Sequence, residues 1–413
     1  MTDPERPRDR IATLDLIRGI AILGILAINM AGFAGPIAAT VTPHWQGTAS
    51  PADQAWFLAG FILFEGKMRG LLSLLFGASI VLFIESAEAR GRDGDSAQLR
   101  RLLWLGAIGY VHFLLLWWGD ILFTYALCGV IALLLRHLPV KAMVPAALLG
   151  FAAWHGAGMA ETAPALLADL RVAAASAPPA EAAEIAQDTS AFRAAAQEEM
   201  AVERGGYPGL LDYKLGALSL FPFKAAILGV GEIVPMMLLG MALMRSGFFT
   251  GGWPAGRIWL LAVGGLVLGG AATLALAMLA KASGFAPRTM EAILAYWAAL
   301  PHLFLTLAYA ALIVASRGNR PSGRLAQRMS AVGRMALTNY LACSLVFTAL
   351  FYGWGLGLIG TASAGQQAGL IALGWIAMLL ASPRVLARFE QGPAERLWRW
   401  LAGQRIGQHS QAI

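Results

Sequence analysis

Long apolar runs constrain the fold of this chain more than any other feature of its sequence. Ten mainly apolar segments approach the length of about 20 residues that a helix needs to cross a bilayer. They cover residues 12–33, 66–84, 101–118, 121–135, 142–160, 218–244, 258–279, 292–315, 332–352 and 367–381. A water-soluble fold is excluded by the same pattern, because 58% of the residues are hydrophobic and only 13% are charged. We therefore predict an all-α polytopic membrane protein with about ten transmembrane helices.

The basic residues predict the orientation of these helices. Lys and Arg concentrate before the first span and after each even-numbered span. Ten spans place on one side Arg6, Arg8, Arg10, Arg90, Arg92, Arg100, Arg136, Lys141, Arg245, Arg257, Arg317, Arg320, Arg324, Arg328, Arg384, Arg388, Arg396, Arg399 and Arg405. We expect cytoplasmic termini in a bacterial inner membrane. No continuous basic stripe is present, so nucleic acid is not an expected partner despite the net charge of +7.

The predicted spans divide the chain into five regions. These are a cytoplasmic N-terminus (1–11), a first transmembrane bundle (12–160), an outer helical loop (161–215), a second bundle (216–385) and a cytoplasmic tail (386–413). The expected partners are the lipid bilayer and a small-molecule or glycan acceptor, and a homodimer is compatible with this organisation.

The second span is expected to be irregular. Residues 52–64 are apolar too, but the charge pattern allows only one crossing before Arg90. We expect this segment to lie at the outer interface or to form a broken start to the span, with Glu65, Lys67 and Arg69 at the break. Broken helices at membrane depth usually line a cavity.

Ionisable residues inside apolar spans are costly and indicate either a partner or a function. In the first span, Asp15 and Arg18 are three residues apart and share one helical face, so they can form an ion pair or contribute to a phosphate site. Asn29 lies about three turns further along the span. It can bond to a neighbouring helix or to a ligand.

Two histidines are candidate general bases. His44 lies in an outer loop, where a lone histidine is usually only solvated. Asp120 lies at the tip of a tight turn between the third and fourth spans, with His112 about two turns of helix before it and Tyr125 beyond. A histidine oriented by a carboxylate can take and return a proton near neutral pH, although a neutral histidine bonded to a neighbouring helix is the simpler alternative.

The ninth span opens with a donor-rich patch on the predicted cytoplasmic side. Arg334, Thr338 and Asn339 lie within about one turn of helix. They can bind an anionic phosphate, or they can satisfy helix ends, with Arg334 pairing with Asp15. Glu232 and His302 are isolated ionisable residues of the sixth and eighth spans.

Several kinds of chemistry have no support in the sequence. There is no Walker loop, GxGxxG after a strand, HExxH or GxSxG. The two cysteines, Cys128 and Cys343, lie in separate apolar runs and predict neither a disulfide framework nor a metal site.

Five segments together resemble the YeiB-like family of bacterial membrane proteins, a domain-of-unknown-function family. They are LDLIRGIAILGIL from Leu14, HFLLLWWGDIL from His112, GMALMRSGF from Gly240, GRMALTNYL from Gly333 and QGPAERLWR from Gln391. The resemblance covers nearly the whole chain and implies the same fold class and topology.

A more distant likeness concerns the first span and the loop after it. The Asp-x-x-Arg-Gly-x-Ala pattern, Asn29 and the segment around His44 resemble heparan-alpha-glucosaminide N-acetyltransferase and the wider transmembrane acyltransferase superfamily. This resemblance implies acyl-CoA, with acetyl-CoA as the example, as co-substrate, Asn29 and His44 in acyl transfer, and Asp15 and Arg18 at the start of the span. The spacing around His44 departs from that pattern, which leaves His112 with Asp120 as an equal candidate for the base.

The favoured hypothesis is a transmembrane acyltransferase. Arg18 and Arg334 would hold the phosphates of cytoplasmic acyl-CoA, a histidine would deprotonate an acceptor at the outer face, and Asn29 or a turn amide would stabilise the oxyanion. The alternative is a transporter or lipid-binding protein that uses His112 and Asp120 as a proton or substrate site. A sensor or assembly partner is the third hypothesis.

Overall fold

The computed structural model describes residues 11–317 and 323–403, and every regular element in these ranges is a helix. This confirms the predicted all-α class. Arg6, Arg8, Arg10, Arg320 and Arg405, used above for orientation, lie outside the described residues. So does nearly all of the predicted N-terminus.

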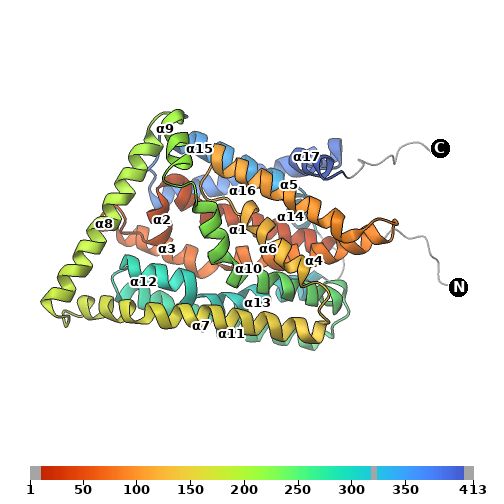
Figure 1. Ribbon diagram of the computed structural model, residues 1–413, viewed down its shortest axis with the longest axis horizontal. Coiled ribbons are helices and arrows are strands. Elements are labelled where there is room, and N and C mark those ends of the chain that lie inside the picture. Colours follow the sequence, from red (N-terminus) through yellow and green to blue (C-terminus); the bar gives the residue numbers. More distant parts are fainter. Residues whose placement is uncertain (1–10, 318–322, 404–413) are drawn as a thin grey trace.

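Long helices run side by side through the molecule and form its body (Figure 1). They are α1 (Ala12–Ala34), α4 (Lys67–Glu88), α5 (Gly94–Leu115), α7 (Val140–Ala173), α10 (Phe221–Arg245), α11 (Ala255–Ala282), α13 (Ala299–Arg317) and α16 (Ala364–Phe389). Shorter helices complete it: α2 (Ile37–Val41), α3 (Pro51–Leu63), α6 (Leu122–Leu134), α9 (Tyr207–Leu215), α12 (Pro287–Ala292), α14 (Arg324–Arg334), α15 (Ala336–Phe351) and α17 (Pro393–Leu401). One turn, η1 (Phe248–Thr250), is a 3₁₀ helix, and η2 (Ile293–Trp297) is a π-helix.

In the described part of the chain, seven helices are long and apolar enough to cross a membrane, and eight if the bent pair α14–α15 forms one span. Each predicted span overlaps at least one helix, and the eighth and ninth predicted spans each cover parts of more than one. However, α6 has only 13 residues, and α5 carries Asp95, Arg100 and Arg101 near its start. The polytopic architecture therefore stands, while the count of ten spans stays a prediction.

A short interruption separates α3 from α4, at the position of the break expected in the second span, although the two together form one apolar stretch, Pro51–Glu88, that counts as a single candidate span. Helix α3 ends at Leu63 and α4 begins at Lys67, with Gly66 between them at a φ of 72°. A Cβ atom at Gly66 would lie 2.0 Å from Nδ1 of His302, so the turn needs glycine for space as well as for conformation. The buried Lys67 ammonium donates a hydrogen bond of 2.6 Å to the carbonyl of Phe61.

The ninth predicted span, 332–352, is not one straight helix. Helices α14 and α15 meet at an angle of 80°. The bend is stabilised because a carboxylate oxygen of Glu395 accepts hydrogen bonds from the N–H groups of Leu337 and Thr338, which begin α15. The Asn339 amide donates to the carbonyl of Val332 across the bend.

A helical cap, called here the outer cap after the outer loop predicted for 161–215, closes one end of the molecule. Helix α7 continues to Ala173, past the predicted end at 160, and α8 (Pro179–Arg204) lies across the ends of other helices at the left of Figure 1. Both carboxylate oxygens of Glu199 accept the N–H of Ile37, at 3.1 and 3.2 Å, and so attach α8 to the start of α2.

Candidate functional site

One cavity, called here the inner cavity, lies on the predicted cytoplasmic side among α1, α4, α5, α6, α14, α15 and α17. It has a volume of about 240 Å³. Four arginines line it: Arg18, Arg101, Arg334 and Arg399. Much of the remaining wall is apolar, from Ile22, Leu72, Leu75, Phe76, Ile80, Leu105 and Leu122. A cavity with guanidinium groups and an apolar wall suits an anion that carries an apolar chain.

The arginines are held by specific contacts. Arg18 donates to Asp15 at 3.0 Å and to the Ser79 hydroxyl at 3.2 Å. Arg101 lies 4.1 Å from the centre of the Phe83 ring and 4.5 Å from that of the Trp398 ring. Contacts with the protein therefore hold the side chains of Arg18 and Arg101 in position at the cavity.

Close packing of α1 on α14 brings Arg18 and Arg334 to the same cavity. A Cβ atom at Gly19 would lie 1.9 Å from the Met329 carbonyl oxygen, and one at Gly333 would lie 1.9 Å from that of Asp15. The two helices touch through backbone at these glycines. Each glycine directly adjoins a cavity arginine, which gives the Arg-Gly and Gly-Arg pairs of the sequence a structural reason.

The other predicted cofactor residues face protein groups. The Asp15 carboxylate accepts from Arg18. The Thr338 hydroxyl donates to Glu395 at 2.5 Å, and the Asn339 amide donates to Val332 and, at 3.2 Å, to Ser382. None of the three lines the inner cavity. Their role in holding a cofactor stays a prediction.

His112 and Asp120 form the pair that their spacing suggested. Nδ1 of His112 lies 2.8 Å from Oδ2 of Asp120, and the other carboxylate oxygen accepts the N–H of Phe123 at 2.8 Å. The two side chains are 1% and 2% exposed. Nε2 of His112 is buried and has no hydrogen-bond partner among the described residues. With Nδ1 donating to the carboxylate, Nε2 carries the lone pair that a general base needs.

Tyr340 connects the inner cavity with this pair and was not singled out from the sequence. Its ring lines the cavity and lies 5.1 Å, between centres, from the ring of His112. Its hydroxyl accepts from the N–H of Ile121 and donates to the carbonyl of Gly119. The His112–Asp120 pair therefore lies behind Tyr340, outside the cavity wall. In the sequence, the signal for Tyr340 is its place in the GRMALTNYL segment that begins at Gly333.

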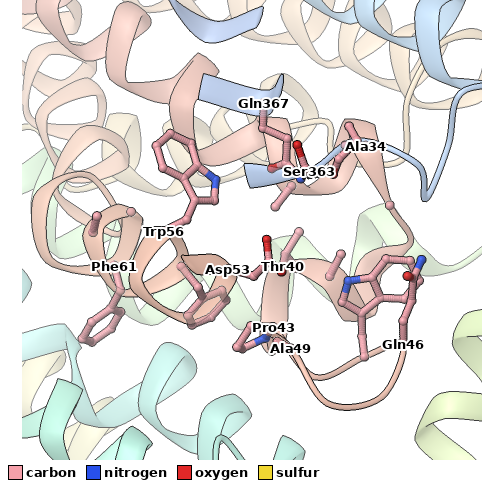
Figure 2. A pocket seen from close by; sticks show the side chains of 18 of the residues that line it. Ala34, Thr40, Pro43, Gln46, Ala49, Asp53, Trp56, Phe61, Ser363 and Gln367 are labelled. Atoms are coloured by element: carbon pink, nitrogen blue, oxygen red, sulfur yellow. Dashed lines mark hydrogen bonds between the residues drawn. The ribbon is translucent and has the colours of Figure 1, made fainter. Parts of the chain in front are cut away.

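A second cavity, called here the outer cavity, has a volume of about 550 Å³. It is formed by α1, the loop after α2, α3 and the start of α16. Figure 2 shows Trp56 and Gln46 on opposite sides of it, with Ser363 and Gln367 between them. Asp53 and Glu65 contribute carboxylates.

Neither Asn29 nor His44 lines either cavity, although their neighbours Ile28, Pro43 and Trp45 line the outer one. Nδ1 of His44 accepts the N–H of Ala49, and its ring packs on Phe285 at 5.5 Å. Burial lowers the pKa of His44, so the ring is neutral at pH 7. Both predicted catalytic roles stay predictions.

A charged layer of Glu65, Arg69 and Glu232 connects the walls of the two cavities. Arg69 donates to both carboxylate oxygens of Glu232, at 2.8 and 3.3 Å, and lies 3.7 Å from Glu65, which lines the outer cavity. Glu232 is therefore not the isolated group that the sequence suggested. The carbonyl of Arg69 accepts from the hydroxyl of Tyr125, which lines the inner cavity.

Comparisons with known proteins agree with this architecture. The family described as "Protein of unknown function (DUF418)" matches residues 243–405. The chain is 32% identical over 402 residues to the uncharacterized protein YeiB of Escherichia coli K12, covering 97% of this chain and 98% of that protein. It is 29% identical to the uncharacterized protein YxaH of Bacillus subtilis 168, covering 96% and 95%. No solved structure gives a significant match.

Proposed function

The chain belongs to the DUF418 family of YeiB-like membrane proteins, and we propose from its cavities that it is a transmembrane acyltransferase of the bacterial inner membrane. It would move an acyl group from cytoplasmic acyl-CoA to a sugar or other small acceptor at the outer face. The observation that carries this proposal is the inner cavity, which has four arginines in its wall and a buried His–Asp pair directly behind it.

The donor site follows from the shape and charge of the inner cavity. Guanidinium groups bind phosphate oxygens in bidentate fashion, and CoA carries several phosphates. A volume of about 240 Å³ is small beside the roughly 300–1,000 Å³ of typical ligand sites. We therefore place only the acyl group and the adjoining thiol arm inside, with the nucleotide at the arginines. The wall from Leu72 to Ile80 is roughly 12 Å long at 1.5 Å per residue.

The transfer step uses the free lone pair of His112. An acceptor hydroxyl or amine gives its proton to Nε2 while its oxygen or nitrogen attacks the thioester carbonyl. The C–S bond then breaks, and the departing thiolate takes the proton back from the imidazolium. Asp120 holds the ring through Nδ1 and stabilises its charged form.

Tyr340 must move for this step, since it separates the cavity from His112. Its displacement would release the N–H of Ile121, which its hydroxyl now occupies. That amide is a donor for the developing oxyanion.

A transporter is the second candidate, and the charged layer favours it. Two cavities whose walls are connected by Glu65, Arg69 and Glu232 are the arrangement expected of a membrane protein that exposes a site to each side in turn. A transporter would carry its substrate across unchanged, whereas an acyltransferase releases free CoA.

Everted inner-membrane vesicles from cells overproducing the protein distinguish the two, because they contain potential acceptors. We expect release of the CoA thiol from added acetyl-CoA, and we expect the rate of release to be about 10²–10⁴-fold lower in His112→Ala. His137→Ala is the matched control, since that ring is 71% exposed and outside both cavities. Equal thiol release by the wild type and His112→Ala would refute the catalytic proposal, and uptake of intact acetyl-CoA would support transport.

A further inference from the structure

We propose that the outer cavity binds a hydroxylated organic ammonium ion, that is, a small molecule with a protonated amine and several hydroxyl groups. This inference concerns a second cavity, and it does not rest on acyl transfer at the first. It follows from three properties of the cavity wall: its charge, the direction of its hydrogen bonds and its aromatic side chains.

The charge of the wall is negative. Asp53 and Glu65 are its ionisable side chains, and none of its described lining residues is Lys, Arg or His. Arg69 lies near Glu65 at 3.7 Å, but it is engaged more closely by Glu232 at 2.8 Å. In the layer beneath the cavity, Glu65 and Glu232 lie with the Arg69 guanidinium and with the Lys67 ammonium, which donates to the carbonyl of the lining residue Phe61. The excess negative charge is therefore that of Asp53, in the wall itself. A cation is favoured in such a cavity, and an anion is repelled.

Several side-chain donors of the wall are already occupied. The side chains of Thr40, Gln46, Thr361 and Gln367 donate to carbonyl groups of the protein, and the Ser50 hydroxyl donates to Asp53. The hydroxyl groups among these residues offer a ligand acceptor oxygen atoms. A ligand that satisfies them must bring donors, as ammonium and hydroxyl groups do.

Two helix starts at the cavity could in principle attract an anion instead. Both are capped by their own side chains. The Ser50 hydroxyl accepts the N–H of Asp53 at the start of α3, and Ser363 and Gln366 form a reciprocal capping box at the start of α16. The first-turn N–H groups that would bind an anion are therefore partly used.

Aromatic rings complete the match. Trp45 and Trp56 line the cavity together with Phe57, Phe61 and Phe64. The face of an indole ring attracts a cation by about 0.5–2 kcal/mol and also packs against the C–H face of a sugar-like ring. The volume of about 550 Å³ lies within the range of small-molecule sites.

Calorimetry on the purified full-length protein in lipid nanodiscs tests this proposal with galactosamine and galactose, which differ by the ammonium group. At about pH 6, where the amine is protonated, we expect galactosamine to bind about tenfold more tightly than galactose. Asp53→Asn and Glu65→Gln should each remove most of that difference. Glu198→Gln is the matched control, because this carboxylate is exposed on α8 and does not line the cavity.

Equal affinity for the two sugars in the wild type would overturn the proposal, whatever the variants do. So would tighter binding of glucuronate, which is an anion, or unchanged galactosamine binding in a folded Asp53→Asn variant. Weaker galactosamine binding in discs containing phosphatidylethanolamine than in pure phosphatidylcholine would support the ammonium site, because the ethanolamine headgroup brings a competing ammonium group. No acyl-CoA is present, so a failure here leaves the test of acyl transfer unaffected.

Discussion

The Asp-x-x-Arg-Gly segment of α1 combines two roles that the sequence presented as alternatives. Asp15 and Arg18 do form an ion pair, at 3.0 Å, within one helix. The Arg18 side chain is nevertheless 26% exposed and lines the inner cavity. An ion pair on one side of a guanidinium leaves its other N–H groups available, because arginine has five. The pair therefore orients Arg18 for a ligand and does not exclude one.

A single carboxylate in the outer cap makes stability depend on pH. Burial raises the pKa of Glu199 from 4.5 to about 7, although its bond from Ile37 opposes the shift. The folded state thus binds this proton more tightly than the unfolded state. Glu199 therefore contributes about 3 kcal/mol to the free energy of unfolding below about pH 4.5, and this contribution is lost as the pH rises through about 7. Burial also raises the pKa of Glu203, which acts in the same direction.

We predict that the melting temperature of the purified protein falls between about pH 5 and pH 8 and falls less in Glu199→Gln. The variant keeps an oxygen acceptor for Ile37 but cannot ionise. Differential scanning fluorimetry at matched salt measures the effect, with Glu198→Gln as the exposed control that should keep the wild-type slope. A wild-type slope in Glu199→Gln would contradict the assignment.

Among the helices, α1 and α14 depend on backbone contact at two glycines. An added methyl group at Gly333 would lie 1.9 Å from the Asp15 carbonyl oxygen, which no side-chain rotation can relieve. We expect Gly333→Ala to destabilise the protein by roughly 1–3 kcal/mol and to weaken binding at the inner cavity, since Arg18 and Arg334 would move apart. Thermal melting and ligand titration measure the two effects.

Gly264→Ala is the control for this substitution. Gly264 also lies within a helix, α11, but nothing is found within 4 Å of an added Cβ atom there. Alanine at this position should leave the stability of α11 unchanged or raise it slightly, because alanine has a higher helix propensity than glycine. Equal stability of the two variants would show that contact at Gly333 does not determine the packing of α1 on α14.

Helix positions could largely be predicted from the sequence, because apolar runs and basic loops are local signals. The bend between α14 and α15 could not, since it depends on Glu395, which follows the bend by some 60 residues. Similarly, the Asp15–Arg18 and His112–Asp120 pairs could be proposed from short spacings. Tyr340 could not be placed beside His112, because that contact joins helices more than 200 residues apart.

Across the whole molecule, the two cavities have opposite charge. The inner cavity has four arginines and one carboxylate, Glu395, whereas the outer cavity has two carboxylates and no basic group among its described lining residues. With this difference in charge, the cavities can bind ligands of opposite charge from the two sides of the membrane only if they open to opposite sides. The predicted topology assigns the inner one to the cytoplasm.

Cysteine labelling in intact cells tests that topology. We expect a membrane-impermeant maleimide to modify Ala191→Cys, on the exposed surface of α8, without permeabilisation. Gln327→Cys, exposed on α14, should react only after permeabilisation. Because Cys128 is buried and Cys343 half-buried, a variant lacking both is the background. Reaction of both sites from outside would reverse or reject the predicted orientation.

The proposed function requires that the arginines of the inner cavity hold an acyl-CoA. Calorimetric titration of the detergent-purified protein with acetyl-CoA measures this binding, with Arg18→Ala and Arg334→Ala as variants and Arg384→Ala, outside the cavity, as control. We predict micromolar binding, on the order of −8 kcal/mol, in the wild type and the control, and its loss in both cavity variants. A folded wild-type protein that does not bind acetyl-CoA, or variants that bind it unchanged, would contradict the proposal.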